Sequence, residues 1–278
     1  MSYRSIRLGV YLLAIQAIVS LPLFAAPSSE SEIAVAPVFF HGSYTEPTMH
    51  ESGTFYGISG SVGYCGKKLF GPLDFARVEG TVARGDVGYT STSSGTIPVV
   101  HDSMVEARLL TGGSFKAANK VDLTPFTGFG YRKLNDNGSG LTSSSSSVFY
   151  DRESNYYYSP IGIEVSGAVS ESWKIAGTLE YDLLWWGMQY SNITDANNAY
   201  YTYSDNLKNR QHSGYGIRAS VKAIRKVQSM SLAFEPFVRY WSIDRSDPMT
   251  IQKNGVDVAY GEPQNTTTQY GLAISMIF

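Results

Sequence analysis

The sequence has few charges, one cysteine and, after its first 25 residues, no long apolar run. Charged residues make up only 17% of the 278 positions, and 22 basic against 24 acidic side chains leave no positive footprint for nucleic acid. Cys65 alone can form no internal disulfide and lies too far from the N-terminus to anchor a lipid, so we interpret it as a small strand residue. A chain without a second apolar run can cross a membrane only with strands.

The N-terminus has the pattern of a secretory signal peptide. Arg4 and Arg7 precede an almost entirely apolar stretch over residues 8–24, and small and polar residues follow it. We predict cleavage after Ala25, because Pro27 disfavours a cut one residue later. The short apolar span argues against the alternative, a retained membrane anchor.

The last nine residues alternate as a strand with one apolar face does. Every second residue from Tyr270 to Phe278 is large and apolar. Such a strand, ending on an aromatic residue, is similar to the closing strand of bacterial outer-membrane β-barrels, which the barrel assembly machinery recognises. We therefore predict that Tyr270 and Phe278 form an assembly signal. The 20 Tyr, 27 Gly and mean hydropathy of −0.14 agree with strands that are half polar.

Alternating segments rich in Tyr, Gly and Val can be counted along the chain. They predict ten strands, over residues 33–46, 53–66, 72–90, 103–115, 121–135, 155–168, 173–190, 213–225, 230–244 and 267–278. Eight or twelve strands stay open, because Pro37 interrupts the first segment and long loops can hold extra hairpins. The predicted fold class is all-β: a single antiparallel up-and-down transmembrane β-barrel over residues 26–278, after a signal peptide over 1–25.

The predicted connections alternate in length, as short periplasmic turns and long extracellular loops do in outer-membrane barrels. The long loops are expected over residues 91–102, 136–154, 191–212 and 245–266. Prolines lie inside three predicted strands, where we expect bulges or strand ends: Pro125, Pro160 and Pro236. Aromatic residues near the extracellular strand ends predict an interfacial girdle: Tyr156, Tyr157, Tyr158, Trp185, Trp186, Tyr190, Tyr240 and Trp241.

Alternation also predicts a balanced set of charges in the lumen, the space enclosed by the barrel. These residues are Arg77, Glu79, Glu106, Arg108, Arg132, Glu164, Glu180, Asp182, Arg218, Lys222, Glu235 and Arg239. Because buried charges must be paired or hydrated, the favoured interpretation is a cross-linked polar core that plugs the barrel. The alternative is a narrow path for ions or small solutes. Ten strands enclose little more space than eight, which side chains fill, so a general porin is excluded.

Catalytic and metal-binding motifs are weak. His101 and Asp102 are the adjacent pair suited to acid–base work, with Asp205 and His212 expected at the same end of the barrel. The omptins, ten-stranded outer-membrane proteases, use a His and several Asp at this rim, but their paired aspartates and close Asp–His pair are missing here. No dinucleotide fingerprint, G-x-S-x-G run or spaced ligand set occurs, so we expect no cofactor and no metal.

One predicted extracellular loop carries aromatic residues suited to binding. Tyr200, Tyr201 and Tyr203 lie among Asn and Ser, an amphipathic and hydrogen-bonding mixture found in binding surfaces. Ordinary rim tyrosines are the equally weighted alternative. The loop before it holds a flexible polar tract over residues 135–147.

Three segments, over residues 123–132 (LTPFTGFGYR), 235–243 (EPFVRYWSI) and 262–271 (EPQNTTTQYG), resemble small outer-membrane β-barrel proteins of the porin-family or OmpA type. The resemblance covers roughly residues 30–278 and implies a place in the bacterial outer membrane. It implies contact with lipid, lipopolysaccharide and the assembly machinery, and with a host or environmental ligand at the loops. Our first hypothesis is a non-enzymatic surface protein that binds through its loops or supports the envelope. The second is a narrow channel, and the third is a hydrolase at the extracellular rim.

Overall fold

The computed structural model describes the backbone of residues 31–278, and their side chains except at 65–68 and 70. The predicted signal peptide and its cleavage site lie outside the described residues, and so does the side chain of Cys65. Within the described part, no helix is long and apolar enough to cross a membrane.

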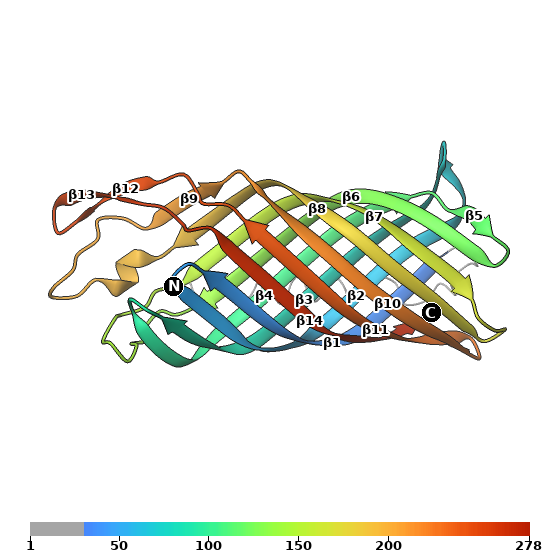
Figure 1. The fold of residues 1–278 in the computed structure, drawn as a ribbon, viewed down its shortest axis with the longest axis horizontal. Coiled ribbons are helices and arrows are strands. Elements are labelled where there is room, and N and C mark those ends of the chain that lie inside the picture. Colours follow the sequence, from blue (N-terminus) through green and yellow to red (C-terminus); the bar gives the residue numbers. More distant parts are fainter. Residues whose placement is uncertain (1–30) are drawn as a thin grey trace, which may run out of the picture. The chain divides into compact units, whose positions relative to one another are not determined.

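The described residues form one closed antiparallel sheet of ten strands around the barrel, which confirms the predicted fold class and strand number. Its strands are β1 (Ser31–Glu46), β2 (Met49–Phe70), β3 (Leu73–Ser91), β4 (Gly95–Gly112), β6 (Val121–Asn137), β7 (Arg152–Ala168), β8 (Trp173–Ser191), β10 (Gly214–Val227), β11 (Met230–Ile243) and β14 (Asn265–Ile277). In Figure 1 red β14 lies beside blue β1, and this pairing closes the wall. Two short strands extend it: β5 (Phe115–Ala118) pairs with β6, and β9 (Leu207–Gln211) pairs with β8.

Side chains alternate between the two faces of the wall, as a period of two requires. On β8, Leu179, Tyr181 and Leu183 are exposed on the outside, while Glu180 and Asp182 between them are buried inside. The outer face is therefore an apolar band and the inner face is polar and charged, which is the pattern that a barrel wall in lipid needs.

Three of the eight residues predicted for the aromatic girdle do not face outward. Tyr157 stacks on Trp186 at 5.0 Å between ring centroids, on the outer side of the wall. Tyr156, Tyr158 and Trp241 instead point into the lumen and are buried to 1% exposure or less. The physical reason is the strand period, because residues on either side of an outward Tyr157 must face inward.

The loop predicted over residues 91–102 is strand instead. β4 begins at Gly95, so only residues 92–94 connect it to β3. Pro98 does not end the strand, because a register shift between Val87 and Tyr89 on β3 accommodates it as a bulge. His101 and Asp102 consequently lie on β4 rather than in a loop.

Two of the predicted loops contain ordered structure. The 192–206 segment holds a 3-10 helix, η1 (Ile193–Ala196), and the 244–264 segment holds the hairpin β12 (Met249–Lys253) and β13 (Val256–Tyr260). In Figure 1 these lie beyond the barrel strands, at the end we call the loop end. Buried Ile193, Leu207 and Ile251 join the two segments in one apolar cluster.

The bulges or strand ends predicted at Pro125, Pro160 and Pro236 are wrong, because each proline pairs in register inside its strand. Pro125 and Pro236 lie in uninterrupted register with Ile163 and Leu272. The carbonyl of Pro125 accepts a hydrogen bond from the N–H of Gly113, just after β4 ends, so its nitrogen faces the end of that neighbour. The missing ladder bond is tolerated there because the partner strand has stopped.

Candidate functional site: the lumen and the loop end

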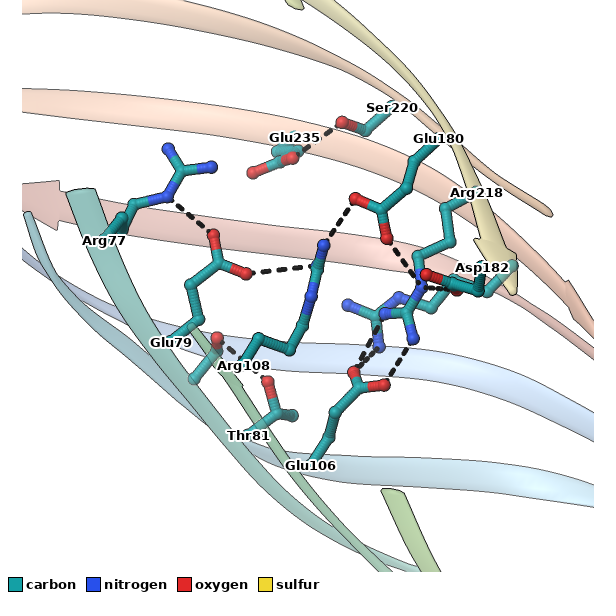
Figure 2. A network of polar contacts seen from close by, with 12 residues as sticks. Arg77, Glu79, Thr81, Glu106, Arg108, Glu180, Asp182, Arg218, Ser220 and Glu235 are labelled. Carbon is teal, nitrogen blue, oxygen red and sulfur yellow. Dashed lines mark hydrogen bonds and ion pairs between the residues drawn. The ribbon is translucent and has the colours of Figure 1, made fainter. Parts of the chain in front are cut away.

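The twelve charged residues predicted for the lumen all lie on the inner face. Six are cationic and six are acidic, so the set is neutral overall. Alternation along β3, β4, β6, β7, β8, β10 and β11 turns them inward, and Figure 2 shows those of β3, β4, β8, β10 and β11 facing one another.

Arg218 on β10 is the centre of this network. Its Nε donates to Asp182 Oδ2 at 2.6 Å and its Nη1 donates to Glu106 Oε2 at 2.9 Å. Its Nη2 contacts Glu106 Oε1 and donates to the Tyr158 hydroxyl at 2.9 Å. Since Glu106 is on β4 and the strand order runs β4-β6-β7-β8, with β10 next, these bonds cross the lumen.

A second arm of the network runs along β3 and β4. Arg108 donates to Glu79 at 3.1 Å and also contacts Glu180 on β8, while Arg77 is 2.8 Å from Glu79. Lys222 and Glu235 form a further pair at 3.1 Å. Figure 2 shows the resulting chain of alternating charges. Paired in this way, the charges avoid the large cost of isolated buried ions.

The other lumen charges lie against aromatic rings or line a cavity. The Arg132 guanidinium lies 5.3 Å from the Trp241 ring, although two of its nitrogens find no hydrogen-bond partner among the described residues. Arg239 lies 4.5 Å from the Phe237 ring and 3.8 Å from Glu106. Glu164 lines a cavity.

An aromatic layer, consisting of Tyr156, Tyr158 and Trp241 in one buried cluster and Phe40 in another, lies inside the barrel, where two cavities are found. The turn-end cavity, of about 150 Å³, is lined by the network. The loop-end cavity, of about 60 Å³, shares none of its lining residues. All four aromatic side chains are at most 2% exposed, and Tyr158 meets Trp241 edge-on at 5.0 Å. Phe40 on β1 and Tyr156 and Tyr158 on β7 occupy inward positions between residues that line the two cavities, so these buried rings narrow the lumen at this level.

Glycine makes room for this layer. A Cβ atom added at Gly130 would lie 2.2 Å from the Tyr158 ring, closer than any van der Waals contact allows. The Tyr158 hydroxyl is then positioned to donate to Glu106 at 2.8 Å, which links the layer to the charge network.

The loop-end cavity contains three carboxyl groups, Glu51, Asp102 and Asp136. Two of them lie closer to the loop end than outward tyrosines on the same strands. Glu51 is five residues from Tyr56 on β2, and Asp136 is five residues from Tyr131 on β6. The pKa of Glu51 is raised to about 8, mainly by burial and secondly by the Asp136 carboxylate. Burial with Asp136 and Glu51 raises the pKa of Asp102 to about 9.

Arg152 is the cation beside these acids, and other partners already occupy it. Its guanidinium is 2.7 Å from Glu46 and also contacts Glu262. Its ring partner is Tyr44, with 5.7 Å between the guanidinium and the ring. Among the described residues, Arg152 therefore pairs with Glu46 and Glu262 and not with the three cavity carboxyls.

The residues considered for hydrolysis are not brought together. Neighbouring strand residues face opposite sides, so Asp102 faces the loop-end cavity while His101 lies outside, 2.7 Å from Asp86. His212 contacts Asp247 at 2.7 Å, near β9 and on another part of the wall. Within residues 31–278, no group of three or more His, Cys, Asp or Glu is arranged to hold a metal ion.

The loop tyrosines are held differently from one another. Tyr200 is 82% and Tyr201 49% exposed, whereas Tyr203 packs edge-on against Tyr260. Asn198 Oδ1 accepts the backbone N–H groups of Tyr200 and Tyr201 at 2.8 and 3.0 Å. Asn254 donates to the Tyr200 carbonyl at 3.0 Å, so the hairpin fixes the loop that displays the two rings.

The two residues of the predicted assembly signal lie on the closing strand. Tyr270 faces outward beside His41, with 5.3 Å between the ring centroids. The backbone of Phe278 exchanges hydrogen bonds with Ile33 on β1, at 2.8 and 3.2 Å.

Sequence reasoning missed the aromatic layer and the loop-end acids. For Trp241 the signal was available, because alternation from Glu235 and Arg239 puts it inside. For Asp102 the same alternation runs back from Glu106, but the loop predicted there obscured it.

No family model and no curated protein sequence matches the chain. The solved structure of the outer membrane protease OmpT from Escherichia coli is similar, with a TM-score of 0.61, 10% identity, and 93% of this chain and 99% of that chain covered. The translocator domain of the autotransporter NalP from Neisseria meningitidis gives 0.42 at 11% identity, over 97% and 95%. Ail, the attachment invasion locus protein of Yersinia pestis, gives 0.30 at 9% identity, over 90% and 99%. The likeness to OmpT shows a shared outer-membrane β-barrel fold and nothing finer.

Proposed function

We propose that this protein is an integral barrel of the Gram-negative outer membrane that acts without catalysis, by contacting a host or environmental partner at its loop end. The observation that carries the proposal is the ordered display of Tyr200 and Tyr201. Exposed aromatic rings on a fixed backbone lose little conformational entropy on binding, which favours affinity. In this proposal lipid and lipopolysaccharide contact the outer wall, and the assembly machinery reads Tyr270 and Phe278.

The closed lumen supports this function over a channel. The aromatic layer blocks the barrel with side chains that a solute must displace, and the charge network beneath it is cross-linked from wall to wall. We expect a correctly folded protein in a planar bilayer to give no discrete conductance steps. Reproducible steps in the native protein would favour the channel instead.

A hydrolase has weaker support. His101 with Asp86 and His212 with Asp247 are separate, solvent-exposed pairs. Neither pair lines one of the two cavities, so no described pocket places a substrate within reach of it, as general acid–base catalysis requires.

Adherence tests the proposed function directly. Gram-negative cells that display the protein would be measured for attachment to cultured epithelial cells and to an abiotic surface. We expect the double variant Tyr200→Ser, Tyr201→Ser to lose most attachment, and Asn198→Ala to lose part of it, because the rings stay but their backbone support goes. Lys116→Ser, an exposed change on β5, is the matched control. Undiminished attachment by the double variant on both surfaces would contradict the proposal.

A further inference from the structure

The three carboxyl groups of the loop-end cavity form an arrangement that folding alone does not explain. Asp102 and Asp136 are direct cross-strand partners on β4 and β6, and both face the same cavity. Like charges directly opposite each other destabilise a sheet. A feature that costs stability without structural gain points to a binding role.

Glu51 completes the arrangement from β2. Its side chain is 5% exposed, and its Oε1 has no hydrogen-bond partner among the described residues although it lines the cavity. Asp102 and Asp136 each have one oxygen in the same condition, again within residues 31–278. A buried acceptor without a donor costs free energy, and a ligand that supplies N–H donors removes that cost.

The rest of the lining indicates what kind of cation fits. Phe55, Met104 and Leu134 line the same cavity as the carboxyls. Its volume of about 60 Å³ holds roughly four to six water-sized groups at about 10–15 Å³ each. The three carboxyls do not form a set arranged to coordinate a metal ion within the described residues. A protonated amine carries three diverging N–H donors and an apolar chain, so it can reach separated carboxylates and also contact the apolar residues.

We propose that the loop-end cavity binds a small organic cation, a primary alkylammonium group, through Glu51, Asp102 and Asp136. This site lies inside the barrel wall and goes beyond the partner contact proposed for Tyr200 and Tyr201. Its test is therefore separate from adherence.

The test measures binding of n-propylammonium chloride to the folded barrel in detergent micelles at pH 9 by isothermal titration calorimetry. We expect saturable binding, at least tenfold weaker in Glu51→Gln and in Asp102→Asn. Both substitutions keep the side-chain shape and remove a charge. Asp86→Asn, which removes an acid from the outer wall beside the site, should stay within twofold of wild type.

Neutral 1-propanol, matched in size, should not bind, and sodium chloride at equal ionic strength should not displace the amine. A shift in migration between unheated and heated protein on a denaturing gel, equal to that of wild type, would verify that each variant is folded, and Asp136→Asn replaces any variant that is not. The proposal is overturned if wild type shows no saturable binding, if both charge-removing variants bind as wild type does, or if sodium displaces the amine equally well.

Discussion

Removing the guanidinium of Arg218 is the sharpest test of the lumen. Arg218→Met keeps an unbranched side chain of similar length but takes away every charged contact to Glu106, Asp182 and Glu180. The side chains of these four residues are between 0% and 7% exposed, so bulk water reaches them poorly when the partner is lost. Breaking a buried ion pair by removing one partner costs about 3–5 kcal/mol, because the other charge is left uncompensated.

The assay is urea unfolding of the barrel in lipid vesicles, followed by tryptophan fluorescence. We expect the free energy of unfolding to fall by about 3–5 kcal/mol in Arg218→Met. Lys116→Met is the matched control, since its pair with Asp122 is largely exposed and should cost at most about 1 kcal/mol. Adding Glu106→Gln to Arg218→Met should recover part of the loss, because one of the stranded charges then disappears. A loss below about 1 kcal/mol in the single variant would refute the view that the charges of the network are shielded from bulk water and tightly paired.

Two further measurements address the packing and the loop-end acids. Gly130→Ala should destabilise the barrel by about 1–3 kcal/mol through its clash with Tyr158, whereas Gly80→Ala, whose added Cβ meets no described atom within 4 Å, should change stability far less; equal losses would contradict the fit of the aromatic layer. Because burial raises the pKa of Glu51 from 4.5 to about 8, the folded state binds more protons than the unfolded state between these values, so the free energy of unfolding should decrease as the pH rises through this window and level off above it. Glu51→Gln should flatten that profile, and a profile unchanged by the substitution would show that other groups control it.

The fold was predictable because a strand wall imposes the shortest period in protein structure. Once Glu180 is taken to face inward, alternation places Asp182 inside and Leu183 outside. Alternation alone does not predict where the side-chain direction changes along a strand. Trp185 and Trp186 on β8 form a bulge, with a register shift against Tyr157 and Tyr158, so Gln189 is buried although simple alternation from Glu180 puts it outside. A bulge depends on cross-strand pairing, and one strand's sequence does not contain it.

The candidate sites were less predictable, for a different physical reason. Charges in the lumen follow from each strand alone, whereas a pocket depends on which residues from separate strands reach the same height. Asp102 and Asp136 belong to a like-charged pair only because β4 begins at Gly95 and runs in register with β6. Asp102 lines a cavity because the β3–β4 turn is short. The polar residues 92–96 give no sign of where that turn ends.

The distribution of stability within the barrel explains why function should concentrate at one end. The middle of the barrel holds packed rings and paired charges, which meet where Tyr158 contacts both Arg218 and Trp241. The loop end contains unfavourable features, namely neighbouring buried carboxyls inside and exposed tyrosines outside. The strand pairing of the barrel does not depend on these side chains. Proteins keep such locally costly features where binding compensates for them. The loop-end acids and the displayed tyrosines are therefore the two places where a ligand would stabilise this molecule most.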